Sequence, residues 1–143
     1  MNRLTLEKAN AIIEAGFIES KKLSLQPMSI VILDPGGHLI AFQRQDKAGI
    51  LRFDIAFAKA YGALGMGINS RDLALKANEI PDLIQGAIAA SKGRLIPAPG
   101  GMLILNNDNV IIGAAGASGD TSDNDEHVVI SGILSVGLIL KPS

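Results

Sequence analysis

The stretch PGGMLILNNDNVIIGAAGASGD, residues 99–120, decides the fold because it predicts two strands joined by a turn. Two aliphatic runs flank Asn106-Asn107-Asp108-Asn109, and Asn and Asp tolerate the left-handed backbone that tight hairpin turns require. The pattern therefore predicts a β-hairpin over residues 102–116. Gly113, Gly116 and Gly119 follow in and after the second run. Small residues in a strand allow a helix backbone to approach closely, so we expect the last helix to pack against these glycines.

A second hairpin is predicted over residues 28–43. Its turn is Asp34-Pro35-Gly36-Gly37, in which proline presets the first central φ and glycine accepts a positive φ. Helical apolar periodicity predicts helices over residues 5–22, 52–66, 70–76, 81–91 and 125–136, with residues 138–140 as the helix end or a last strand. Two hairpins flanked by helices indicate the α+β class, with helices packed mainly on one face of an antiparallel sheet.

The helix boundaries carry their own expectations. Thr5 and Ser70 are candidate N-caps, and Asp123 with Glu126 three residues later fits a capping box. In the first helix one apolar stripe is predicted to face the core, with two further apolar residues off it and available to a partner chain. The stripe is Leu6, Ala9, Ile13 and Phe17, and the residues off it are Ile12 and Ile18.

Composition narrows the class of protein. The 143 residues predict a single domain, 1–143, with an aliphatic core, since 48% are hydrophobic but only 3% aromatic. The absence of Cys excludes disulfides and thiol chemistry, and a net charge of −1 argues against nucleic acid as a partner. With neither a signal-peptide pattern nor an 18-residue apolar run, we expect a cytoplasmic protein and no membrane contact. The mean hydropathy of +0.31 favours a homo-oligomer.

An acidic cluster with a histidine follows the glycine-rich strand. Asp120, Asp123, Asp125 and Glu126 precede His127. The glycines do not follow the G-x-G-x-x-G pattern, and the acids would repel phosphate, so a nucleotide site is not favoured. His127 is a candidate haem ligand or general acid/base, while a histidine beside a helix cap is the structural alternative. No EF-hand spacing is present, and no metal site is predicted.

Other residues are weaker candidates. His38 follows the first turn and Met102 the second Gly-Gly pair, and a His/Met pair suits haem iron. Arg44 is a candidate carboxylate clamp or the partner of a surface ion pair. Lys59 and Tyr61 lie in an otherwise apolar helix, where a lysine snorkels to solvent or bonds at an interface.

Several segments, in order, resemble one family over nearly the whole chain. They are LTLEKA (4–9), SIVILDPGGHLIAFQRQD (29–46), IAFAKAY (55–61), PGG (99–101), IGAAGASG (112–119) and Asp125-Glu126. This pattern resembles the GlcG/HbpS-like family (DUF336, the haem-degrading domain family), which includes the C-terminal domain of PduO-type proteins. The resemblance implies a profilin-like antiparallel sheet of about five strands flanked by helices, a homo-oligomer, and haem or corrinoid binding in some members.

The resemblance also implies a departure. PduO-like members have a histidine early in the domain that resembles the axial haem ligand, and the predicted first helix here has neither His nor Cys. Haem would then need His127, His38, Met102 or Tyr61. The first hypothesis is therefore a small-molecule-binding protein, with haem or a related tetrapyrrole as ligand. The alternatives are an accessory protein of glycolate, glycerol or propanediol utilisation, or an enzyme on a small organic acid using Glu126, His127 and Arg44.

Overall fold

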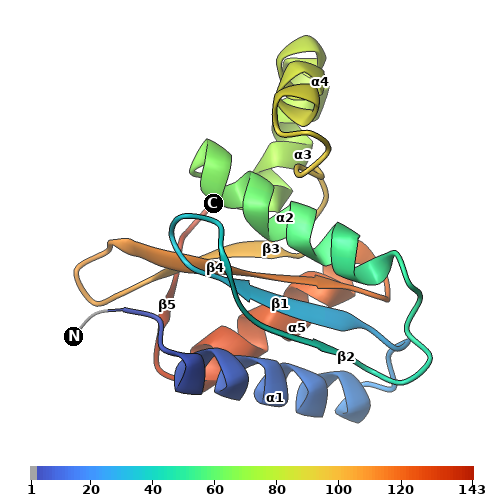
Figure 1. Ribbon diagram of the computed structural model, residues 1–143, viewed down its shortest axis with the longest axis vertical. Helices are drawn as coiled ribbons and strands as arrows, with labels where there is room; N and C mark the ends of the chain where they lie inside the picture. The colour runs from blue at the N-terminus through green and yellow to red at the C-terminus, as the bar shows by residue number, and fades with distance from the viewer. Residues whose placement is uncertain (1–2) are drawn as a thin grey trace.

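The computed structural model describes residues 3–143, which form an antiparallel sheet between two layers of helices (Figure 1). The sheet has five strands in the order β2-β1-β4-β3-β5. The elements in chain order are α1 Leu6–Lys22, β1 Ser29–Leu33, β2 Leu39–Arg44, α2 Arg52–Met66, α3 Ser70–Glu79, α4 Pro81–Ala90, β3 Gly101–Leu105, β4 Ile111–Ser118, α5 Ser122–Ser135 and β5 Ile139–Leu140. The α+β class, the two hairpins and the last strand are confirmed.

Helices cover both faces of the sheet. Helices α1 and α5 lie side by side under one face, and α2 crosses the other (Figure 1). The expectation of helices mainly on one face is wrong, because the inner strand β1 is apolar on both sides: Ile30 and Ile32 face the α1–α5 layer, while Val31 and Leu33 face α2. A strand buried on both faces has a continuous apolar run instead of an alternating one.

Helices α3 and α4 form an arm that extends away from the sheet (Figure 1). A small cluster of Leu73, Ile84 and Leu95 forms its core. Ile84 is the one fully buried residue of α4, although most of that helix is apolar. The arm therefore has only a small buried core, and several of its apolar side chains are exposed to solvent.

The buried face of α1 differs from the prediction. Ala9 and Ile13 are buried as expected, but Leu6 is 59% exposed and Ile12 is fully buried. Helix α5 lies so close to α1 that a Cβ at Gly132 would collide with the carbonyl oxygen of Ile12. The α1 stripe is therefore rotated toward α5, which sequence periodicity within α1 alone does not reveal.

The glycines of β4 provide close contacts, but the last helix is not their partner. A Cβ at Gly116 would collide with the carbonyl oxygen of Ala56 in α2. Gly113 is tight against the Leu33 carbonyl on β1, and Gly119 against the segment that precedes β1. The expectation that α5 packs on them is wrong because α2, on the opposite face, approaches the middle of β4.

We predict that Gly116→Ala lowers the free energy of unfolding by about 2 kcal/mol or more, because the added methyl group must push α2 away from β4. The matched control is Gly86→Ala in α4, where nothing lies within 4 Å of the added Cβ. That change should stabilise the protein by about 0.5–1 kcal/mol, the helix preference of Ala over Gly. Urea unfolding followed by circular dichroism measures both. Equal effects at the two glycines would contradict the close approach of α2.

Candidate functional site

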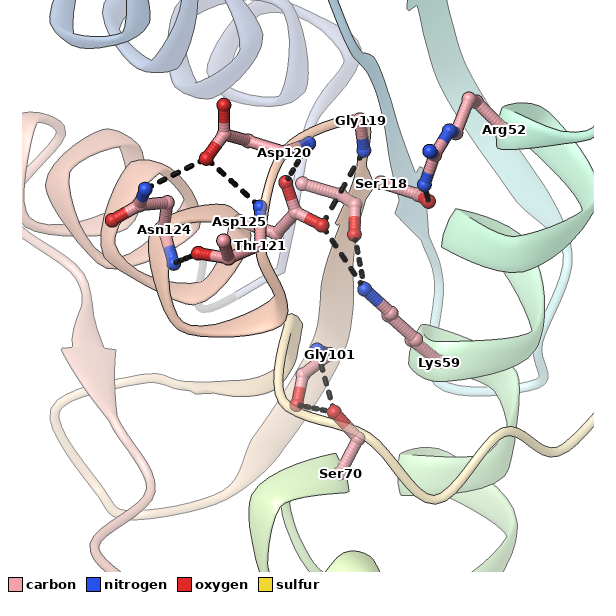
Figure 2. A network of polar contacts seen from close by, with 11 residues as sticks. Arg52, Lys59, Ser70, Gly101, Ser118, Gly119, Asp120, Thr121, Asn124 and Asp125 are labelled. Carbon is pink, nitrogen blue, oxygen red and sulfur yellow. Dashed lines mark hydrogen bonds and ion pairs between the residues drawn. The ribbon is translucent and has the colours of Figure 1, made fainter. Parts of the chain in front are cut away.

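A buried ion pair joins the helices of the two layers at one end of the sheet (Figure 2). Lys59 on α2 and Asp125 on α5 have side chains that are 3% and 1% exposed. The Lys59 Nζ lies 3.2 Å from Asp125 Oδ2 and donates to the Ala117 carbonyl at 3.0 Å. A Cβ at Gly100 would be 2.9 Å from the same Nζ. The expectation that Lys59 snorkels to solvent is wrong because Asp125 gives its ammonium group a buried partner.

Burial shifts both members of the pair toward their neutral forms. Desolvation lowers the pKa of Lys59, and the Asp125 carboxylate counteracts this. Desolvation raises the pKa of Asp125, and Lys59 together with the backbone N–H groups of Asp120 and Gly119 counteracts that. Each charge thus depends on the other, since an isolated buried charge is strongly unfavourable.

The turn into α5 positions Asp125. Thr121 is the N-cap of α5, and its hydroxyl accepts from the Asn124 N–H at 3.2 Å. Asp125 accepts from the backbone N–H of Asp120 at 2.9 Å. The Asp120 carboxylate in turn accepts from Gln26 N at 2.8 Å and from Asn124 Nδ2 at 2.7 Å. The acids of this turn therefore serve the backbone of the junction, as Figure 2 shows.

The first residues of α3 are hydrogen-bonded to strand β3 at the same end of the sheet. The Ser70 hydroxyl accepts from Gly101 N at 2.7 Å and donates to Gly101 O at 3.2 Å. Asn69 accepts from Leu103 N and donates to the Lys141 carbonyl. The expectation that Ser70 caps α3 is wrong, since Asn69 occupies the N-cap position and Ser70 is used for the strand contact instead.

Glu126 is engaged by Arg71 of α3. The Arg71 Nε lies 3.1 Å from both carboxylate oxygens of Glu126, and its guanidinium also pairs with Asp123. The predicted capping box is wrong, because Thr121 caps α5 and the side chain of Glu126 turns to the arm. Arg71 thus ties the arm to α5. Within residues 3–143, no three His, Asp or Glu side chains gather to hold a metal ion.

The remaining candidate residues lie apart from one another. His127 points toward α1, with its Nε2 2.6 Å from Glu19 Oε2. Met102 is 5% exposed and belongs to the core under α1 and α5. Arg44 is exposed at the end of β2. No contact joins Arg44 to Glu126 or His127 among the described residues, so these three do not form one constellation.

A row of aromatic rings lies along the side of α2 that is next to β2. Phe42, Phe53, Phe57 and Tyr61 follow one another with centroids 4.6, 5.9 and 5.5 Å apart. They are four of the five aromatic residues of the chain. The Arg94 guanidinium lies 4.3 Å from the centre of the Tyr61 ring. Nearly all the aromatic residues of this chain therefore lie together on one half-buried surface.

The turn before β2 brings His38 to the Tyr61 end of this row. A Cβ at Gly37, whose φ is +83°, would meet the Tyr61 ring at 2.7 Å. His38 is 81% exposed in its side chain, with Nδ1 3.2 Å from Asp34 Oδ1. The same oxygen accepts from the N–H groups of Gly36 and His38. Burial alone would raise the pKa of Asp34, but these hydrogen bonds and the His38 ring lower it below its usual value.

Two shallow hollows lie along the aromatic row. One, of about 300 Å³, lies between Phe53 and Phe57 on one side and Lys92 and Arg94 on the other. A second, of about 130 Å³, lies between Tyr61 and the Gly36-Gly37 turn. The first hollow has two cations, Lys92 and Arg94, and one carboxylate, Asp54, at its rim. The turn that closes the second is followed directly by His38.

Sequence reasoning missed the partners of the junction. In the sequence Asp125 is one acid of a cluster, and Arg52 and Arg71 have no pattern that distinguishes them. The signal for Lys59–Asp125 was present as a charged residue within an apolar helix, since a buried charge requires a charged partner. Which acid would pair with it depends on the turn geometry after β4, which spacing along the chain does not reveal.

We predict that Asp125→Asn lowers the free energy of unfolding by about 3–5 kcal/mol, because it leaves the Lys59 ammonium buried without a counter-charge. The double variant Lys59→Met with Asp125→Asn should lose less than the sum of the two single changes. The control is Lys76→Met in the exposed Lys76–Glu79 pair, at 3.7 Å, with an expected change below about 0.5 kcal/mol. Urea unfolding of the four variants gives the coupling, and additive losses would refute the pair.

Comparison with known proteins agrees with this architecture. Residues 4–134 match the family described as haem degrading protein HbpS-like. A 15.0 kDa protein of the dhaT-dhaS intergenic region of Citrobacter freundii is 31% identical over 129 residues, covering 85% of this chain and 84% of its own. The fold is similar to a PduOC:heme complex (TM-score 0.88, 18% identity, 98% and 99% of the two chains) and to Klebsiella pneumoniae ORFY (0.85, 22%, 96% and 92%). By this match over nearly all of its length, the chain belongs to the HbpS-like family.

Proposed function

We propose that this protein binds haem or a related tetrapyrrole along the aromatic row between α2 and β2. One observation carries the proposal: the Gly37 backbone lies against the Tyr61 ring at the end of the aromatic row, and the next residue, His38, has its Nδ1 held by Asp34. A metal-ligating histidine usually donates its other ring N–H to a carboxylate or carbonyl. No hydrogen bond or ion pair of His38 Nε2 is formed among residues 3–143, so with the proton on Nδ1 facing Asp34 this nitrogen would offer its lone pair to iron.

The residues of this face fit such a group. The faces of Phe53 and Phe57 suit a large planar apolar ring. Lys92 and Arg94, at the rim of the adjoining hollow, suit its carboxylate side chains. Tyr61 is a second candidate for the iron ligand, through its phenolate oxygen, which is a known haem ligand. Haem, when bound, would supply redox-active iron; His38 would hold the metal and the aromatic row would exclude water from one side of the ring.

The relatives support a ligand of this kind. The family is described as haem degrading, and a chain of similar fold is a PduOC:heme complex. The first helix here contains neither His nor Cys, so the axial ligand must come from elsewhere. His38 fits better than His127, whose Nε2 is paired with Glu19, and better than Met102, which is buried in the core.

An accessory role without a bound ligand is the second candidate. It is supported by the Citrobacter freundii relative, whose name places it between dhaT and dhaS. Hemin titration separates the two candidates, because an accessory protein without a ligand gives no saturable change in the Soret band.

We also propose that the protein is a homo-oligomer that buries the arm. Leu75, Ile80 and Leu83 are 57%, 41% and 56% exposed, and α4 carries a single charge, Asp82. Exposed apolar patches on the surface of a protein mark interaction surfaces.

The structure contains no helix among residues 3–143 that is long and apolar enough to span a membrane.

We predict that wild-type protein gives a saturable Soret shift with hemin and that His38→Ala weakens binding at least about tenfold. The matched control is His127→Ala, which should bind as wild type does. Arg94→Gln should weaken binding less than His38→Ala, because it removes one rim contact and leaves the iron ligand. Absence of any saturable shift refutes haem binding, and a shift that survives the loss of both histidines refutes the ligand assignment.

We predict that Leu83→Lys lowers the molar mass in solution, because a charge on α4 opposes burial of the arm against another copy. The matched control is Val110→Lys in the turn between β3 and β4, where Val110 is 54% exposed and thus similar to Leu83 at 56%. Size-exclusion chromatography with light scattering measures both masses. A monomeric wild-type protein, or dissociation by the Val110 variant alone, contradicts this assignment of the interface.

A further inference from the structure

A row of polar residues crosses three strands on the α2 face of the sheet. The register pairs Ser29 of β1 with Arg44 of β2 and with Ser118 of β4. Directly paired residues in adjacent strands point to the same face. Val31, two residues beyond Ser29, faces α2, so this row also faces the α2 side. It begins where the apolar packing of α2 on the sheet ends.

Arg52, the first residue of α2, reaches one member of this row. Its Nη1 donates to Ser118 Oγ at 3.0 Å, a contact that Figure 2 shows beside the Lys59–Asp125 pair. Arg52 is half-exposed, whereas Ser118 is fully buried. The guanidinium therefore links solvent to a buried hydroxyl, and four of its five N–H donors remain beyond this bond.

Ser29 provides an independent observation. Its side chain is fully buried, and its Oγ has no hydrogen-bond partner among the described residues. A buried hydroxyl without a partner is unfavourable, and native proteins retain few of them. Ser29 lies opposite Ser118 in the register, so the unpartnered hydroxyl is next to the one that Arg52 contacts.

The local charge favours an anion. Neither Arg44 nor Arg52 forms an ion pair among residues 3–143, and the nearby Asp125 carboxylate is committed to Lys59 and to the N–H groups of Gly119 and Asp120. Arg52 is close enough to Lys59 to disfavour its charged form. The N-terminus of α2 has no side-chain cap, and its dipole adds positive potential at the same place.

We propose that Arg52, Ser29 and Ser118 form a binding site for a small carboxylate, separate from the face proposed for tetrapyrrole. A guanidinium matches the two oxygens of a carboxylate in a planar, bidentate contact. The hydroxyls of Ser29 and Ser118 then donate to an oxygen of the same group, which gives Ser29 its missing partner. Arg44, exposed at the strand end, adds charge that attracts the anion.

The test is an NMR titration of the full chain with sodium acetate and sodium lactate, against sodium chloride at equal ionic strength. Amide signals of residues 29, 52 and 118 should shift and saturate at millimolar carboxylate and should not do so with chloride. Arg52→Gln and Ser29→Ala should each weaken binding about tenfold. The matched control is Lys76→Gln, which removes a positive charge from the exposed Lys76–Glu79 pair and should bind within about twofold of wild type.

Ser29→Ala also separates binding from folding. Removing a buried hydroxyl without a partner should raise the melting temperature of the protein without added carboxylate, by about 3 °C. A variant that is more stable but binds less tightly has lost a ligand contact and not its fold. The proposal is overturned if chloride produces the same shifts, if carboxylate shifts do not saturate, or if Ser29→Ala binds as tightly as wild type.

Discussion

The buried pair of Lys59 and Asp125 is the interaction on which the arrangement of layers depends. It joins α2 on one face of the sheet to α5 on the other, around the end of β4. Two helices on opposite faces have no apolar contact with each other, so the apolar core alone does not fix their relative position. An ion pair with defined donors and acceptors supplies that register, at the energetic expense of desolvating two charges.

Small residues make this pair possible. Gly100 and Gly101 leave room for the Lys59 side chain and for the backbone of α2 around it. Gly116 allows α2 to lie close against β4, so that Lys59 reaches the Ala117 carbonyl. Charge and close packing are therefore not separate features of the junction, because the first requires the second.

Much of the architecture follows from sequence patterns, and the parts that do not share a physical cause. The hairpin turns at 34–37 and 106–109 were predictable because Pro, Gly, Asn and Asp act locally through φ. The two-sided packing of the sheet was not, since β1 is as apolar as a strand in many other arrangements. Ile12 and Leu6 exchange their expected environments because α5, distant in sequence, decides which side of α1 is buried.

The candidate sites follow the same rule. His38, Tyr61 and Arg44 are residue types suited to a ligand, but the sequence pattern does not reveal that Gly37 lies against Tyr61. The unpartnered Ser29 and the reach of Arg52 to Ser118 depend on strand register between β1 and β4, and register needs the whole sheet. Residues with suitable chemistry can be identified from the sequence, whereas the ones that lie together on one face cannot.

The aromatic row has an optical consequence. The chain has no Trp and one Tyr, and that residue, Tyr61, is stacked on Phe57 under the Arg94 guanidinium. The tyrosine emission of the protein therefore arises from one ring, located at the end of the row against the Gly37 backbone. A coloured molecule bound there would quench this emission by energy transfer, so the protein contains its own reporter for occupancy of the α2 face.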